Sequence, residues 1–205
     1  MKLTAIKQQV KNPDRVSIFV DGQYSFSLSL DELLSQKLKT NIEIDEPRLK
    51  QLKQVSADGK LRLRAMEWVL NRPRSTREFR DYMFRKKADP DLVDRLVVEF
   101  ESKKYLNEEV FAKWLIDLRR RGNKSDRAIK AELSKKGINL QTAQSFFDEN
   151  NDESDRLDKL ISKKLKIGRY KADPQKLTAY LHRQGFSYDS VRHAIKRHQT
   201  GQEAD

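Results

Sequence analysis

The chain contains an internal repeat, which constrains the fold more than any other feature of the sequence. Four apolar positions recur 50 residues later and again after a further 48 residues: Phe79, Met83, Val93 and Val97, then Ile129, Leu133, Ala143 and Phe147, then Leu177, Leu181, Val191 and Ile195. In each copy the four positions fall at helical spacing on either side of a short turn. Each copy therefore predicts two helices joined by that turn.

A further amphipathic segment precedes each copy. Its apolar stripe comprises Ala65, Trp68 and Val69 in the first copy, Phe111, Ala112, Leu115 and Ile116 in the second, and Leu157, Leu160 and Ile161 in the third. The sequence thus predicts three tandem three-helix repeats at residues 58–104, 105–150 and 153–198, with a tail at 199–205. Because so small a unit buries little surface alone, we expect the repeats to stack into an elongated, curved, mainly α body.

The first 57 residues follow another pattern. Apolar residues alternate on both sides of Asp21-Gly22, which predicts a β-hairpin, and Leu3 to Val10 adds a candidate strand. We expect a small two- or three-stranded sheet, followed by helices that begin at Ser29 and at Asp45.

Helix boundaries can also be predicted within the repeats. Ser75, Asp89 and Asp173 are candidate N-caps, and Gly122, Gly137 and Gly185 are placed where helices should end. The polar run at 148–153 predicts a flexible joint between the second and third repeats.

The charge of the chain indicates a polyanionic partner, which could be nucleic acid, a nucleoprotein or an anionic membrane. The formal net charge is +12, while 37% of the residues are hydrophobic and 36% are charged, which favours several small cores over one large core. The surplus lies in the outer repeats: residues 58–106 hold 13 basic and 9 acidic residues, 107–152 hold 9 and 8, and 153–205 hold 12 and 7. That the charge serves only solubility remains an alternative.

Several functional classes are disfavoured. The chain has no cysteine, and hence no disulfide or thiolate site. We find no signal peptide or membrane span and expect a cytoplasmic protein. The segment Gly122-Asn123-Lys124-Ser125 lacks the upstream glycine of a phosphate-binding loop, the calcium-like spacing at 148–152 lacks its turn glycine, and the histidines form no ligand pair. We therefore expect no metal, no cofactor and no enzymatic activity.

The repeats carry motifs that resemble those of the RecX family. These are Arg72-Pro73-Arg74-Ser75, Tyr105-Leu106-Asn107-Glu108 with Phe111-Ala112, Arg119-Arg120-Arg121-Gly122 with Lys136-Gly137-Ile138, and Leu181-His182-Arg183-Gln184-Gly185-Phe186. The resemblance covers residues 58–198, and Asn107-Glu108 departs mildly from the acidic pair common in the family. Residues 1–45 match nothing specific to it.

This resemblance implies a regulatory protein of DNA repair, DNA recombination and the SOS response. RecX-like proteins bind along the groove of the RecA–DNA filament and inhibit its extension, strand exchange and coprotease functions. The implied partners are RecA and single- and double-stranded DNA, with no membrane partner, and we expect a monomer. A general DNA- or RNA-binding protein with helix-turn-helix-like modules is the alternative.

Basic clusters are the candidate contact residues for nucleic acid or filament. They are Arg72, Arg74, Arg77, Arg85, Lys86, Lys87, Arg119, Arg120, Arg121, Lys124, Lys163, Lys164, Lys166, Arg169, Lys171, Arg192, Lys196 and Arg197. Cations at helix C-termini also complement the helix dipole, which offers a structural explanation for Arg85-Lys86-Lys87. The aromatic residues sit at core spacing, whereas Tyr170 could equally be a core residue or a stacking platform.

Overall fold

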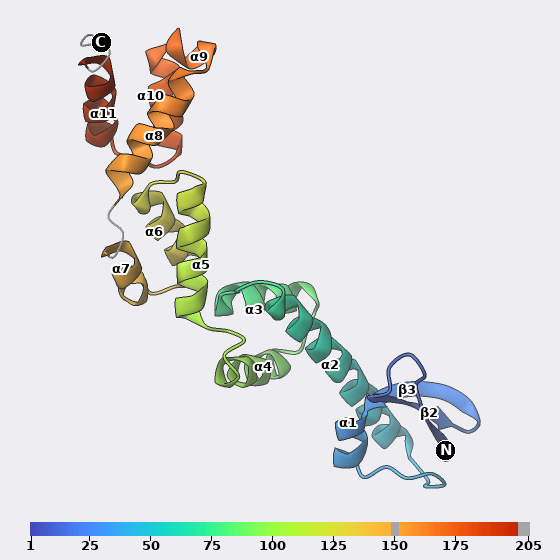
Figure 1. The fold of residues 1–205 in the computed structure, drawn as a ribbon. Helices are drawn as coiled ribbons and strands as arrows, with labels where there is room; N and C mark the ends of the chain where they lie inside the picture. The colour runs from blue at the N-terminus through green and yellow to red at the C-terminus, as the bar shows by residue number, and fades with distance from the viewer. Residues whose placement is uncertain (149–151, 201–205) are drawn as a thin grey trace. The chain divides into compact units, whose positions relative to one another are not determined.

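The computed structural model describes residues 1–148 and 152–200 and is mainly helical, with a small N-terminal sheet (Figure 1). This confirms the predicted fold class. The chain divides into two compact units, residues 1–72 with 83–100 and residues 73–82 with 101–205, and each is considered by itself.

The sheet is three-stranded and antiparallel, in the order β1-β2-β3. Its strands are β1 (Leu3–Gln8), β2 (Arg15–Val20) and β3 (Gln23–Ser29). Asp21 and Gly22 both have positive φ, 49° and 84°, as the tight turn of a two-residue hairpin requires. The predicted hairpin is confirmed, and the candidate first strand ends at Gln8 rather than at Val10.

Two helices follow the sheet. Helix α1 (Leu30–Ser35) begins with the predicted capping box of Ser29 and Glu32, and helix α2 (Glu46–Leu70) begins at the predicted cap Asp45. The hydroxyl of Ser56 on α2 donates a 2.6 Å hydrogen bond to the carbonyl of Ser27 on β3. Helix α2 runs unbroken for 25 residues, so the expected boundary between residues 57 and 58 falls inside it.

The rest of the described chain is helical. Its elements are α3 (Thr76–Arg85), α4 (Pro90–Ser102), α5 (Glu108–Arg121), α6 (Asp126–Lys135), α7 (Leu140–Asp148), α8 (Glu153–Leu165), α9 (Gly168–Lys171), α10 (Pro174–Arg183) and α11 (Tyr188–Thr200). The third repeat therefore contains a short extra helix, α9, which was not predicted because four residues are too few to show a helical period. Part of the joint expected at 148–153 lies outside the described residues.

The repeat is visible in the backbone of the middle turns. Lys87, Gly137 and Gly185 occupy the same repeat position and all have positive φ, at 56°, 82° and 100°. The residue after each donates back to the helix: Ala88 to the Met83 carbonyl (3.2 Å), Ile138 to that of Leu133 (3.0 Å) and Phe186 to that of Leu181 (3.4 Å). The side chains of Ser75, Ser125 and Asp173 cap the N-termini of α3, α6 and α10, again at one repeat position.

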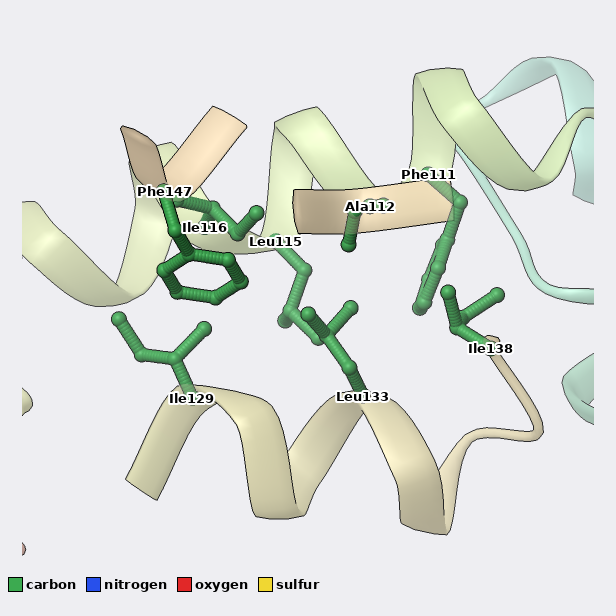
Figure 2. Packing of buried hydrophobic residues seen from close by; sticks show 9 residues of the cluster. Phe111, Ala112, Leu115, Ile116, Ile129, Leu133, Ile138 and Phe147 are labelled. Atoms are coloured by element: carbon green, nitrogen blue, oxygen red, sulfur yellow. The ribbon is translucent and has the colours of Figure 1, made fainter. Parts of the chain in front are cut away.

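The second and third repeats each have their own apolar core. In the second, Leu115 and Ile116 of α5 face Ile129 and Leu133 of α6, with Phe147 of α7 closing the cluster (Figure 2). Leu133 is fully buried, as the repeat predicts. In the third, Ile161, Leu177, Leu181 and Phe186 form the corresponding core.

Successive repeats contact one another through equivalent positions. A methyl group added at Gly137 would lie 3.3 Å from Cβ of Arg77, and one added at Gly185 would lie 2.5 Å from Cβ of Ala128. Arg127, which corresponds to Arg77, donates from Nε to the Gly185 carbonyl at 3.0 Å. The glycine turn of each of these repeats therefore packs on the first turn of the middle helix of the preceding repeat. In the third repeat this contact is too close to admit a side chain at Gly185.

Candidate nucleic-acid interface

The basic residues of the first repeat lie at the two ends of α3. Arg72 and Arg74 are half-buried and Arg77 is exposed, all three close to the start of the helix. Arg85, Lys86 and Lys87 are exposed at its end. Because Arg72 and 85–87 belong to one unit and Arg74 and Arg77 to the other, these residues are two separate groups of cations.

The basic run at the end of α5 is largely engaged within the protein. Arg119 forms a two-bonded pair with Glu132, with Nε–Oε2 and Nη2–Oε1 distances of 2.7 and 2.6 Å. The hydrogen bond of this pair raises the pKa of Arg119 and lowers the pKa of Glu132, against the opposing effect of burial. Arg121 is exposed, and Nζ of half-buried Lys124 lies 3.5 Å from the Arg183 carbonyl.

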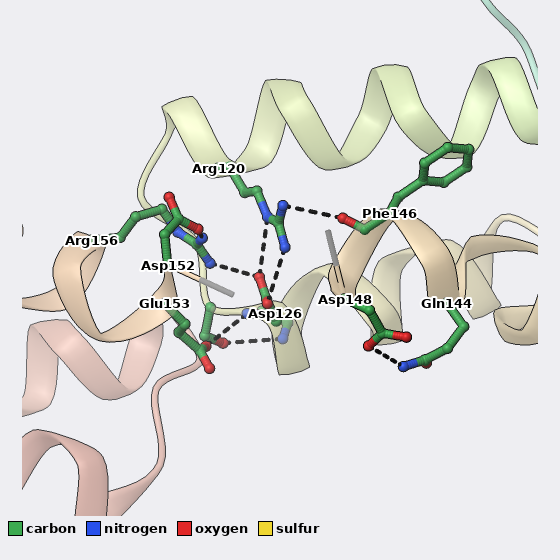
Figure 3. Close-up of polar contacts among 10 residues, drawn as sticks. Arg120, Asp126, Gln144, Phe146, Asp148, Asp152, Glu153 and Arg156 are labelled. Carbon is green, nitrogen blue, oxygen red and sulfur yellow. Dashed lines mark hydrogen bonds and ion pairs between the residues drawn. The ribbon is translucent and has the colours of Figure 1, made fainter. Parts of the chain in front are cut away.

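Arg120 belongs to a charge network that joins the second and third repeats (Figure 3). Its side chain is 10% exposed, and it donates to Asp126 and to the Phe146 carbonyl (3.3 Å). Asp126 also accepts from Nη2 of Arg156 at 2.6 Å, and its backbone N–H donates to Glu153 at 2.8 Å.

Arg156, like its partner Asp126, was not identified from the sequence. It is buried on α8, pairs with both Asp126 and Asp152, and leaves its Nε without a partner among the described residues. Two arginines on one carboxylate form a charged joint, in which loss of one partner leaves buried charge uncompensated. We therefore assign Arg120 and Arg156 to the contact between repeats.

The basic run of the third repeat differs from that of the second. Residues 163–171, which we call the α8–α9 corner, contain five basic residues and no acidic residue. Lys163, Lys166, Arg169 and Lys171 are exposed there. Because no acidic residue within the corner offsets them, these cations present a concentrated positive charge to solvent.

Tyr170 is a core residue, with 6% of its surface exposed. The Arg169 guanidinium lies 4.6 Å from its ring centroid, and Nζ of Lys164 lies 4.4 Å from the ring centroid of neighbouring Tyr180. These contacts are cation–π interactions. Of the two interpretations of Tyr170, the structure thus supports the core residue over the stacking platform.

The last group lies on α11, where Arg192, Lys196 and Arg197 are all exposed. Arg197 pairs with Asp158 of α8 at 2.8 Å, and His198 lies 3.3 Å from the same carboxylate. Arg197 thus contributes less net charge to the surface than its exposure suggests.

The described residues contain no cluster of histidine, aspartate or glutamate suited to hold a metal ion. Within the same residues, no helix has the length and apolar character needed to cross a membrane. Among the described residues, the α8–α9 corner combines four exposed cations with no acidic residue in its segment, and we take it as the candidate interface.

Comparisons with solved structures agree with this fold. A crystal structure titled regulatory protein RecX superposes with a TM-score of 0.71 at 18% identity, covering 95% of this chain and 98% of the other. RecX from Lactobacillus salivarius gives a TM-score of 0.55 at 22% identity, covering 68% of this chain and 95% of the other.

Sequence relatives extend the similarity. Regulatory protein RecX of Bacillus subtilis is 30% identical over 94% of this chain and 75% of its own length, and that of Bacillus velezensis is 32% identical over 95% and 76%. Residues 1–45 match the family described as the regulatory protein RecX N-terminal domain. The expectation that these residues match nothing specific to the family was therefore wrong. From its N-terminal sheet to its last helix, the chain belongs to the RecX family of regulatory proteins.

Proposed function

We propose that this protein regulates homologous recombination and DNA repair by binding the RecA–DNA filament and inhibiting RecA. The observation that carries the proposal is its membership of the RecX family over nearly the whole chain. The net charge of +12 supports it, because a basic protein is attracted to a nucleoprotein whose phosphates carry negative charge. In this proposal it acts as a monomer in the cytoplasm, without a cofactor and without catalysing a reaction.

The proposed contact residues differ in the weight that we give them. We propose that the α8–α9 corner supplies the main phosphate contacts, because four of its cations are exposed and no acidic side chain lies in the segment. Arg72 with 85–87 in one unit, and Arg74 with Arg77 in the other, supply separate further attachments in the first repeat. Arg119 and Arg120 have a lesser role in binding, since each already pairs with a carboxylate.

Two weak attachments on one chain strengthen each other. Once one repeat is bound, the effective concentration of the other can raise avidity by roughly 10²–10⁴ where the geometry permits both contacts. In this proposal, the units that make these contacts are the repeats at 58–104, 105–150 and 153–198.

RecA-dependent ATP hydrolysis on single-stranded DNA tests the proposal. We expect the protein to lower the rate at concentrations at which fluorescence anisotropy shows bare DNA to be scarcely occupied. Inhibition that sets in only when the protein saturates bare DNA would instead favour the general nucleic-acid-binding alternative. No effect on hydrolysis at any concentration would contradict the proposal.

A further inference from the structure

The third repeat contains an apolar pocket next to the α8–α9 corner. Its volume is about 240 Å³, and it lies among α8, α9, α10 and α11. Its apolar lining consists of Ile161, Leu165, Tyr170, Pro174, Leu177 and Ile195. Small-molecule sites usually occupy roughly 300–1,000 Å³, so a pocket of this size is better matched to one bulky side chain than to a cofactor.

The polar part of the pocket lining favours an acidic partner. Lys171, His198 and Gln199 complete the lining. Lys171 is exposed and belongs to the corner, which contains five cations and no acidic residue, and the nearby Asp173 is already paired with Lys176 at 3.1 Å. Asp158, which contacts His198, is already paired with Arg197. An approaching carboxylate therefore meets uncompensated positive charge beside an apolar cavity.

The pocket is poorly suited to hold a nucleic-acid base. Base binding relies on open aromatic faces and on hydrogen bonds to base edges. The lining has two aromatic rings: that of Tyr170, which Arg169 and Tyr180 already contact at centroid distances of 4.6 and 5.6 Å, and the imidazole of His198, which lies 3.3 Å from the Asp158 carboxylate. The other apolar walls are aliphatic, which suits a hydrophobic side chain.

We propose that this pocket is a docking site for an acidic protein segment that inserts one bulky apolar side chain while its carboxylates contact Lys171 and the corner. Such a segment combines an apolar anchor with surrounding charge, the arrangement in which a few buried contacts carry most of the binding energy. The proposal goes beyond inhibition of RecA, because it assigns to the pocket a binding site for a protein segment. This site does not depend on whether the corner also contacts DNA.

Two labelled peptides test the proposal on the full chain by fluorescence anisotropy. Each contains five acidic residues, with a central phenylalanine in one and a central alanine in the other. Burial of the ring should make the phenylalanine peptide bind roughly tenfold tighter or more. Equal binding of the two peptides, or binding of neither, would overturn the proposal.

Variants separate the pocket from the charge around it. Leu165→Gln should abolish the preference for phenylalanine while changing the binding of an oligothymidylate of roughly 15 nucleotides little. Leu34→Gln is the matched control, because Leu34 is 73% exposed on α1. Lys171→Gln should weaken both peptides and keep the preference.

Circular dichroism establishes that each variant is folded. If folded Leu165→Gln retains the preference, the apolar anchor does not bind here and the proposal fails. Should Leu165→Gln unfold, the parent's preference together with the behaviour of Lys171→Gln decides the question. A variant that lost oligothymidylate binding but kept the preference for phenylalanine would test the proposed DNA contact and would not contradict the peptide site.

Discussion

The second and third repeats share one backbone pattern but use their basic side chains in different ways. In the second, Arg119 and Arg120 at the end of α5 pair with Glu132 and Asp126. In the third, the corresponding run at the end of α8 meets no acidic partner within the corner. Charge density along a sequence therefore does not show which cations are available to a partner.

A single repeat position accounts for much of this difference. Glu132 and Tyr180 are 48 residues apart and so correspond in the repeat. Glu132 binds Arg119 through two hydrogen bonds, whereas Tyr180 receives Lys164 on its ring face at 4.4 Å. Replacing a carboxylate by an aromatic ring keeps a cation in place but leaves its charge uncancelled.

The largest expected effect tests whether the two repeats have equivalent cores. Leu133→Ala and Leu181→Ala should each destabilise the protein by roughly 2–5 kcal/mol, because both residues are fully buried at one repeat position. Denaturant unfolding followed by circular dichroism measures the change. Val110→Ala, at a residue 54% exposed, is the control, and a Leu133→Ala protein that unfolds like the parent would refute the repeat pattern.

A smaller effect separates the turns of the two repeats. Gly185→Ala should destabilise by about 1–3 kcal/mol, because φ is 100° and the new methyl group would lie 2.4 Å from the Ser125 hydroxyl. Gly137→Ala should cost less, since its closest neighbour is 3.3 Å away. The order of the two unfolding midpoints checks this, and a reversed order would contradict the stacking of each glycine on the preceding repeat.

The smallest effect concerns the ion pair found in the second repeat alone. Pairing lowers the pKa of Glu132, so it stabilises the fold above the ordinary glutamate pKa and this contribution is lost as pH falls through the lowered folded value. The side chains of Arg119 and Glu132 are 38% and 28% exposed, and with solvent screening we expect about 1 kcal/mol or less.

Glu132→Gln removes this acid-sensitive contribution. Unfolding experiments at neutral pH and in acid should show a smaller loss of stability on acidification for Glu132→Gln than for the parent. An identical acid response of the two proteins would mean that the pair contributes nothing measurable.

The sequence predicted those features that depend on local pattern. Helix caps at Ser29, Asp45 and Ser75 were predicted because a cap and its partner lie within three residues. The repeat was predicted because buried positions recur at fixed spacing. By contrast, the Arg156–Asp126 pair joins residues 30 apart in the chain, and no local pattern marks such a contact.

The interface could be predicted only in part for the same reason. All five basic residues of the corner were named from sequence, yet the sequence could not show that Arg119 is paired while Lys163 is exposed. Tyr170 stayed ambiguous because an aromatic residue beside cations fits both a core and a binding surface. Burial and pairing depend on tertiary contacts, which resolved each case.

The central claim is that the corner, with its exposed cations, is where the protein meets phosphate. Its most direct test compares Lys163, Lys166 and Lys171 changed to Gln with a control in which exposed Lys11, Lys37 and Lys39 are changed to Gln. Both lose three charges, and the three corner contacts should account for about 2 units of the log–log salt slope on single-stranded DNA, at roughly 0.7 per contact. We predict that the corner variant loses this slope and most inhibition of RecA-dependent ATP hydrolysis while the control keeps both. Equal slopes and equal inhibition for the two variants would contradict the account.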